Sequence, residues 1–128
     1  MAPATPLNVT AFDHLVLRCR DVETTLAWYL DVLGLGPVHV DEWREGTAFF
    51  PSARLNEDTI IDFIPGEPSG ERLDHICIVA EPTDLEALVR ERGLDLLEGP
   101  VPRSGARGTG TSIYVRDPDG LTVELRHY

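Results

Sequence analysis

The chain has 128 residues, which suits one domain with a substantial hydrophobic core. Its 22 acidic residues outnumber 11 basic residues, and the resulting net charge of −11 disfavours nucleic acid and anionic membrane surfaces as partners. All the basic residues are arginines, which excludes Schiff-base chemistry on lysine and a lysine-containing phosphate loop.

The first half of the chain predicts a strand, a helix and three further strands. Residues 12–18 alternate as a strand does, and Asp21 is a suitable N-cap for a helix that ends at Gly34. The extended segments predicted after this helix are 37–43, 47–50 and 59–64. The order of elements is therefore βαβββ.

The second half predicts the same order after a linker rich in proline and glycine. Its helix should have Pro82 in the first turn and end at Gly93, and residues 104–110 form a glycine-rich loop. The predicted strands are 73–79, 94–101, 111–116 and 121–126, with a hairpin turn at 117–120 before the last. We expect a loose tail over 1–10 and one domain over 11–128, composed of a module at 11–65, a linker at 66–71 and a module at 72–128.

Chemistry-bearing residues repeat between the two halves. The pair Asp13-His14 on the first strand returns as Asp74-His75, 61 positions later, and Asp62 has a counterpart 62 positions later in Glu124. Repetition at nearly the same offset indicates a duplicated unit. Two imidazoles and two carboxylates at matching places are the donors that a divalent metal site at a pseudo-twofold axis requires.

Three motifs give the chain a resemblance to a known superfamily. They are Asp13-His14-Leu15-Val16-Leu17 followed by Trp28-Tyr29-Leu30-Asp31-Val32-Leu33-Gly34, then Asp74-His75-Ile76, then the segment Ser112 to Leu125. The sequence resembles the vicinal oxygen chelate superfamily, which includes glyoxalase I, bleomycin-resistance proteins and extradiol dioxygenases. The resemblance implies an α+β fold of the glyoxalase type, in which two tandem βαβββ modules form a half-open sheet around a cavity.

The resemblance also implies a site. It makes His14, His75 and Glu124 metal ligands, and it puts Asp62 in a fourth place as a ligand or a base. The same ligand set serves Zn, Ni, Mn and Fe, so the ion stays open. The alternative is that these are hydrogen-bonded polar residues on a half-exposed sheet. The candidate substrate-binding residues are Ser112, Tyr114, Arg107, Phe50 and Trp43.

The expected function is that of a glyoxalase I-like lyase or isomerase acting on a small molecule through two neighbouring oxygens. The catalytic candidates are Asp62 and Glu124, which would move a proton, and Tyr114, which would donate a hydrogen bond to developing negative charge. A small extradiol-type dioxygenase and a metal-free drug-binding protein of the bleomycin-resistance type remain alternatives. The resemblance implies a homodimer, and two cysteines without a secretory signal predict a cytoplasmic protein.

Overall fold

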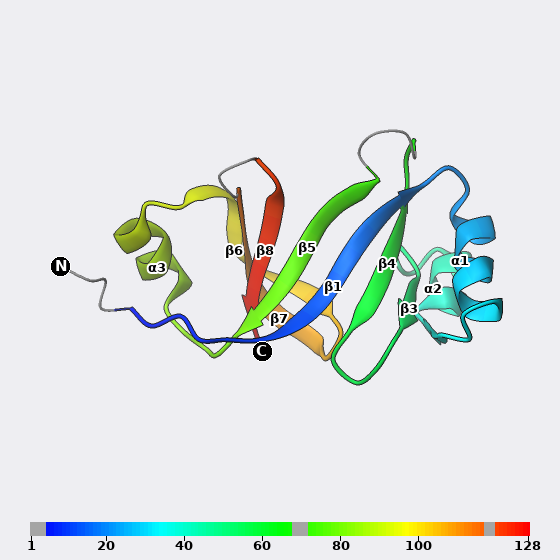
Figure 1. The fold of residues 1–128 in the computed structure, drawn as a ribbon, viewed down its shortest axis with the longest axis horizontal. Helices are drawn as coiled ribbons and strands as arrows, with labels where there is room; N and C mark the ends of the chain where they lie inside the picture. The colour runs from blue at the N-terminus through cyan, green and yellow to red at the C-terminus, as the bar shows by residue number, and fades with distance from the viewer. Residues whose placement is uncertain (1–4, 68–71, 117–119) are drawn as a thin grey trace. The chain divides into compact units, whose positions relative to one another are not determined.

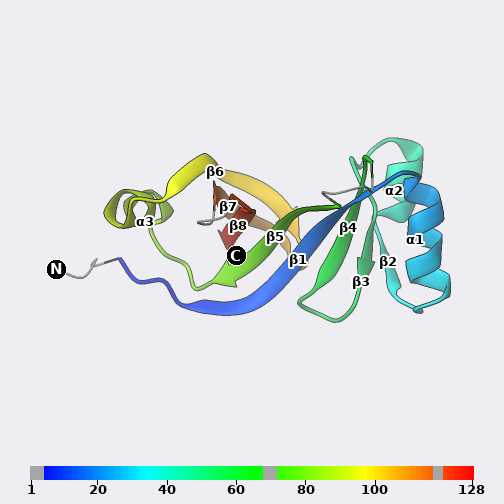
Figure 2. The same cartoon turned by 45° about the horizontal axis from the view of Figure 1, so that its top comes forward.

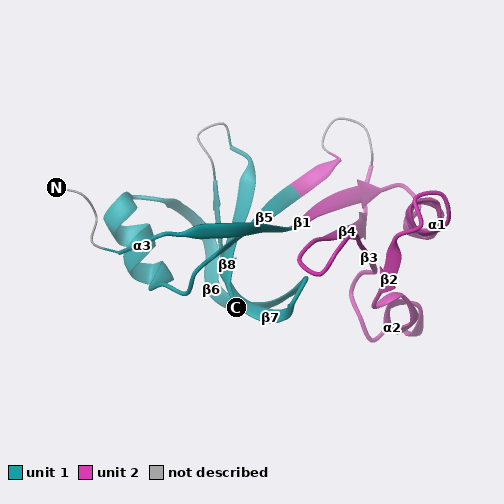
Figure 3. Ribbon diagram, turned by 60° about the horizontal axis from the view of Figure 1, so that its bottom comes forward, with its two compact units in different colours: residues 1–13, 75–128 teal, residues 14–74 magenta. Residues whose placement is uncertain are grey.

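The computed structural model describes residues 5–67, 72–116 and 120–128, and the chain divides into two compact units. Unit 1 comprises residues 1–13 and 75–128, and unit 2 comprises residues 14–74 (Figure 3). The unit boundaries therefore fall inside two strands, between Asp13 and His14 and between Asp74 and His75. No helix in the described part of the chain is long and apolar enough to cross a membrane.

Unit 2 contains four strands in the order β2-β3-β4-β1, of which β3, β4 and β1 are labelled in Figure 1. β1 and β4 are parallel, whereas β3 is antiparallel to both β2 and β4. The elements are β1 (Val9–Cys19, of which residues 14–19 belong to this unit), α1 (Val22–Asp31), β2 (Gly36–Val38), α2 (Val40–Glu45), β3 (Ser52–Arg54) and β4 (Ile60–Pro65). Figure 2 shows α1 and α2 on the side of unit 2 where β2 and β3 lie.

In unit 1, four strands are paired in the order β5-β8-β7-β6, and residues 9–13 of β1 also belong to this unit. Here β5 and β8 are parallel, and β7 is antiparallel to both β8 and β6. The elements are β5 (Leu73–Ala80), α3 (Leu85–Arg92), β6 (Asp95–Gly105), β7 (Gly108–Arg116) and β8 (Thr122–His127). In each unit, the strand that opens the repeat is thus parallel to the strand that closes it.

Each unit has its own hydrophobic core between a helix and its strands. In unit 2, Leu26 of α1 and Phe63 of β4 are buried in one cluster. In unit 1, Leu88 of α3 is buried with Ile113 of β7 and Leu125 of β8. The predicted α+β fold of the glyoxalase type, built from repeated βαβββ units, is confirmed, with one additional short helix, α2, in the first repeat.

The helix α2 replaces most of a segment that was predicted to be extended. The strand β2 stops at Val38, and a helical turn follows, with acidic residues at its start and Arg44 at its end, which complements the helix dipole. Gly46 closes the helix with a φ of 85°, and the following Thr47 N–H also returns to a carbonyl of the helix. The predicted strand at 47–50 is therefore wrong, and β3 begins only at Ser52.

Two details of the second half also differ from the prediction. Residues 104–110 are not a long loop, because β6 and β7 stay paired as far as Gly105 opposite Gly108, and only two residues form the turn. Pro82 lies before the helix, whose N-cap is Asp84; its side chain accepts a hydrogen bond of 3.0 Å from the Ala87 N–H. Gly93 ends the helix as predicted, with a φ of 60°. The predicted turn at 117–120 lies outside the described residues except for its last position.

Candidate functional site

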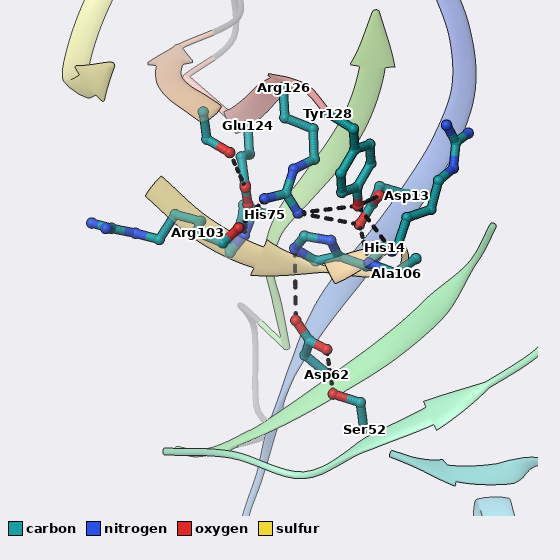
Figure 4. Close-up of polar contacts among 12 residues, drawn as sticks. Asp13, His14, Ser52, Asp62, His75, Arg103, Ala106, Glu124, Arg126 and Tyr128 are labelled. Atoms are coloured by element: carbon teal, nitrogen blue, oxygen red, sulfur yellow. Dashed lines mark hydrogen bonds and ion pairs between the residues drawn. The ribbon is translucent and has the colours of Figure 1, made fainter. Parts of the chain in front are cut away.

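The first half-site lies in unit 2, where His14 of β1 faces Asp62 of β4 (Figure 4). The two strands are parallel, and the Cα partner of Asp62 is Val16, two residues beyond His14. The Nε2 atom of His14 lies 3.6 Å from Oδ2 of Asp62, and both side chains are almost completely buried. A buried imidazole therefore faces a buried carboxylate across one strand pair.

The second half-site repeats this arrangement in unit 1. His75 of β5 and Glu124 of β8 lie on parallel strands, and the Cα partner of Glu124 is Cys77, again two residues beyond the histidine. The Nε2 atom of His75 lies 3.0 Å from Oε1 of Glu124 (Figure 4). The register between histidine and carboxylate is therefore the same in both units, so the repeat seen in the sequence is also a repeat in local structure.

Each carboxylate has a buried serine on its second oxygen. Ser52 Oγ of β3 donates to Oδ1 of Asp62 at 2.5 Å, and Ser112 Oγ of β7 donates to Oε2 of Glu124 at 2.7 Å. Short hydrogen bonds of this kind are expected when the acceptor is a charged carboxylate. Ser112 was predicted as a substrate-binding residue. Ser52 was not singled out, although its position on the strand beside β4 connects it to Asp62.

Tyr114 of β7 belongs to the second half-site. It is the Cα partner of Glu124, and its ring meets the His75 imidazole edge-on, with centroids 5.6 Å apart. Burial, and secondly the negative charge of Glu124, raise the pKa of Tyr114 to about 12. The guanidinium of Arg103, which also pairs with Glu98, lies 5.8 Å from the centre of the Tyr114 ring. The phenol therefore keeps its proton at neutral pH and can donate a hydrogen bond.

The donors of both half-sites fit a divalent ion. Imidazole nitrogen and carboxylate oxygen bind such ions at about 2.0–2.2 Å, so that two of them on one ion lie about 2.8–3.6 Å apart for angles between 90° and tetrahedral. The separations of 3.0 Å between His75 and Glu124 and 3.6 Å between His14 and Asp62 fall in this range. Neutral imidazole with carboxylate is a donor set that Zn, Ni, Mn and Fe accept.

A buried ion pair lies elsewhere in unit 1, and the sequence analysis did not identify it. Asp13 of β1 and Arg126 of β8 are both 0% exposed, and Oδ2 of Asp13 lies 3.6 Å from Nη1 of Arg126 (Figure 4). Asp13 also accepts hydrogen bonds from the Tyr128 hydroxyl and, at 3.0 Å, from the Ala106 N–H in the β6–β7 turn. Burial, and then the hydrogen bond to Asp13, raise the pKa of Tyr128 to about 12.

The guanidinium of Arg126 is held on both sides by unit 1. Its Nη2 donates to the Arg103 carbonyl and its Nη1 to the Tyr128 hydroxyl, whereas its Nε has no hydrogen-bond partner among the residues that the structure describes. The aspartate of the second repeat is paired as well, because Asp74 forms an ion pair with Arg18 of β1 inside unit 2. That pair is partly exposed, with side-chain exposures of 27% and 31%.

The structure brings some of the predicted site residues together within their units. In unit 1 these are His75, Glu124, Ser112 and Tyr114; in unit 2, His14 and Asp62.

Three other candidates lie in different surroundings. Arg107 is in the β6–β7 turn, 5.2 Å from the centre of the Tyr128 ring. Trp43 is on α2, where it packs against the core of unit 2, and Phe50 lies half-buried just ahead of β3. Neither Trp43 nor Phe50 lies on a strand, although the sequence predicted extended segments over 37–43 and 47–50.

Comparisons with known proteins extend over most of the chain. It is 33% identical over 123 residues to the virulence protein STM3117 of Salmonella typhimurium, covering 94% of this chain and 85% of that protein. It is 35% identical over 129 residues to the glyoxalase domain-containing protein RDO1 of Mycosarcoma maydis, covering 95% and 70%. The structure of methylmalonyl-CoA epimerase from Mycobacterium tuberculosis shares the fold, with a TM-score of 0.63 at 20% identity over 93% of this chain and 88% of that chain.

The family comparison agrees with these relatives. The sequence model of the Glyoxalase/Bleomycin resistance protein/Dioxygenase superfamily matches residues 11–125. The match includes both histidines and both carboxylates of the half-sites. The chain belongs to the Glyoxalase/Bleomycin resistance protein/Dioxygenase superfamily.

Proposed function

We propose that the protein is a divalent-metal-dependent enzyme of this superfamily, of the glyoxalase I type, that acts on a small molecule through two neighbouring oxygens. The observation that carries the proposal is the occurrence, in each unit, of an imidazole facing a buried carboxylate at the same register offset. The proposed ligands are His14, His75 and Glu124, with Asp62 as a fourth ligand or a base. This assignment follows the family resemblance and the donor chemistry of each half-site.

When bound, the ion would polarise two adjacent oxygens of the substrate and thereby acidify a neighbouring C–H bond. The chain itself would supply the proton transfer. A carboxylate buried beside an imidazole, Asp62 or Glu124, is suited to take a proton from one carbon and return it to the next. Tyr114 would donate its phenolic proton in a hydrogen bond to the oxygen on which negative charge develops, a role supported by its raised pKa of about 12.

Metal content tests the proposal first. The purified protein, the chelated protein and the protein reloaded with Ni, Zn, Mn or Fe would be measured by elemental mass spectrometry. We expect about one divalent ion per subunit, because two imidazoles and a carboxylate are sufficient donors for one ion. His75→Ala should lose the ion and stay folded. His39→Ala is the matched control, because the His39 side chain is 58% exposed and lies outside both half-sites.

The activity assay would then be selected according to which ion the protein binds. Ni, Zn or Mn directs the assay to isomerisation of a hemithioacetal, and Fe directs it to cleavage of a catechol ring. Unchanged metal content in His75→Ala would remove the ligand assignment. A wild-type protein that takes up none of the four metals on reloading would contradict the metalloenzyme proposal itself and direct the work to ligand-binding screens.

A further inference from the structure

We infer that Ser52 and Ser112 are positioning residues for the two metal-ligand carboxylates. Each serine would hold one carboxylate oxygen so that the other oxygen is presented to the imidazole and to the ion. The inference rests on the proposed function, since it assigns these hydroxyls a role only if Asp62 and Glu124 act as ligands or as a base.

The hydrogen-bond pattern supports this role, because each carboxylate is divided between two different partners. Asp62 directs Oδ1 to Ser52 and Oδ2 to His14, and Glu124 directs Oε2 to Ser112 and Oε1 to His75. The terminal torsion of a carboxylate side chain is broad and roughly twofold. A charge-assisted hydrogen bond to one oxygen selects one orientation of the group, and therefore determines where the other oxygen lies.

The two serines reach their carboxylates from different register positions. Ser52 is the Cα partner of Asp62, so the shorter aspartate is met from directly across the strand pair. In the other unit the residue opposite Glu124 is Tyr114, and Ser112 lies two positions further along, opposite Arg126. The extra methylene of the glutamate allows it to reach this diagonal neighbour, because diagonal pairs in antiparallel sheets are about 7–8 Å apart at Cα.

The same donor chemistry therefore occurs twice with different backbone relationships. If the serines only filled space in a repeated strand pattern, equivalent positions would be expected to carry them. In both units, a serine hydroxyl donates a hydrogen bond to the carboxylate oxygen that does not face the imidazole. Both serines are almost completely inaccessible to solvent, so these hydrogen bonds are not in competition with bulk water.

Cobalt binding provides a test that does not depend on activity. The protein would be chelated and titrated with Co(II), with the visible d–d spectrum recorded for coordination geometry and the Kd for affinity. The variants are Ser112→Ala and Ser52→Ala, each with a threonine variant that restores the hydroxyl. Ser104→Ala is the control, because Ser104 is an exposed serine on β6 of unit 1.

We expect Ser112→Ala to raise the Kd for Co(II) about 10- to 100-fold, the usual effect of removing a group that orients a ligand, and to change the d–d spectrum. Ser112→Thr should restore the wild-type spectrum, and Ser104→Ala should match the wild type. Ser52→Ala should alter the spectrum in the same way if Asp62 is a ligand.

A purely structural role predicts a different result. Alanine variants with a lower melting temperature but unchanged Co(II) affinity and spectrum would overturn the inference while leaving the proposed function intact. Threonine variants that bind Co(II) no better than the alanine variants would also overturn it, because the hydroxyl would then not be the cause. A wild-type protein that does not bind Co(II) would refute the proposed function, and the role of the serines would fall with it.

Discussion

The buried pair of Asp13 and Arg126 allows a quantitative prediction about the stability of unit 1. In Asp13→Ala, the Arg126 guanidinium keeps its charge at 0% exposure but loses its carboxylate. Removing one partner of a buried ion pair costs about 3–5 kcal/mol, chiefly because the remaining charge is left uncompensated. The Ala106 N–H also loses its acceptor. We therefore expect the free energy of unfolding to fall by at least this amount.

The size of the effect on the melting temperature follows from the chain length. Unfolding entropy of about 2.1 cal/mol/K per residue gives about 0.27 kcal/mol/K for 128 residues. A loss of about 3–5 kcal/mol then lowers the melting temperature by about 11–19 °C. Urea unfolding followed by circular dichroism would measure the free energy, and thermal scans the temperature shift. Glu23→Ala is the control, since its pair with Arg44 is about half exposed and should contribute less than about 1 kcal/mol.

A double variant tests whether the loss of stability in Asp13→Ala comes from the uncompensated charge of Arg126. Replacing both partners, as in Asp13→Ala with Arg126→Met, removes the charge together with its counter-charge, and such replacements are often nearly neutral. We expect the double variant to be more stable than Asp13→Ala alone. If the two single-variant losses simply add, the residues are not coupled and the reasoning about the buried charge is refuted.

Three further predictions follow from local features of the fold. Burial raises the pKa of Tyr128 from its ordinary value near 10 to about 12, so folding favours the neutral phenol. The stability that this preference contributes is fully present below about pH 10 and should decline as pH rises toward 12. Urea midpoints measured across this window should fall less in Tyr128→Phe, and an equal fall would contradict the assignment. Asp84→Ala should lower the free energy of unfolding, measured in urea, by about 1 kcal/mol because it removes the side-chain cap of α3. Asp21→Ala should lower it less, because the Asp21 side chain makes no capping hydrogen bond to α1. Equal losses of stability in the two variants would contradict the capping argument. Gly99→Ala should lower the melting temperature, because Gly99 has a φ of 106° and an added Cβ would lie 2.5 Å from the Ser112 carbonyl oxygen; a wild-type melting temperature would show that this segment yields to the methyl group.

The histidine and carboxylate of each half-site could be predicted from the sequence because the alternation of residues along a strand is regular. His14 and His75 lie on equivalent opening strands, and Asp62 and Glu124 lie on equivalent closing strands, so nearly equal offsets of 61 and 62 positions relate the two pairs. Parallel pairing then brings each histidine close to the carboxylate of its own unit. The pattern of spacing carried this information without any knowledge of side-chain conformation.

The partners of these residues were harder to predict because they depend on the register of antiparallel strands. Ser52 meets Asp62 only if β3 pairs with β4 at that register, and a shift by one residue would turn it to the other face. The pair of Asp13 and Arg126 joins residues 113 positions apart, which no local pattern indicates. The helix α2 was missed because its short segment contains too few apolar positions to distinguish a helical period from an alternating one.

The aspartates that precede the two histidines carry an implication for the origin of this chain. Asp13 lies in the first repeat of the sequence and pairs with Arg126 of the second, whereas Asp74 of the second repeat pairs with Arg18 of the first. The two arginines are not equivalent, because Arg126 lies on the closing strand β8 of its repeat and Arg18 on the opening strand β1 of its repeat, so the repeated aspartate forms ion pairs with arginines at two different positions. The two repeats have therefore diverged in sequence around a shared Asp-His pair, and one of the resulting ion pairs is buried whereas the other is partly open to solvent.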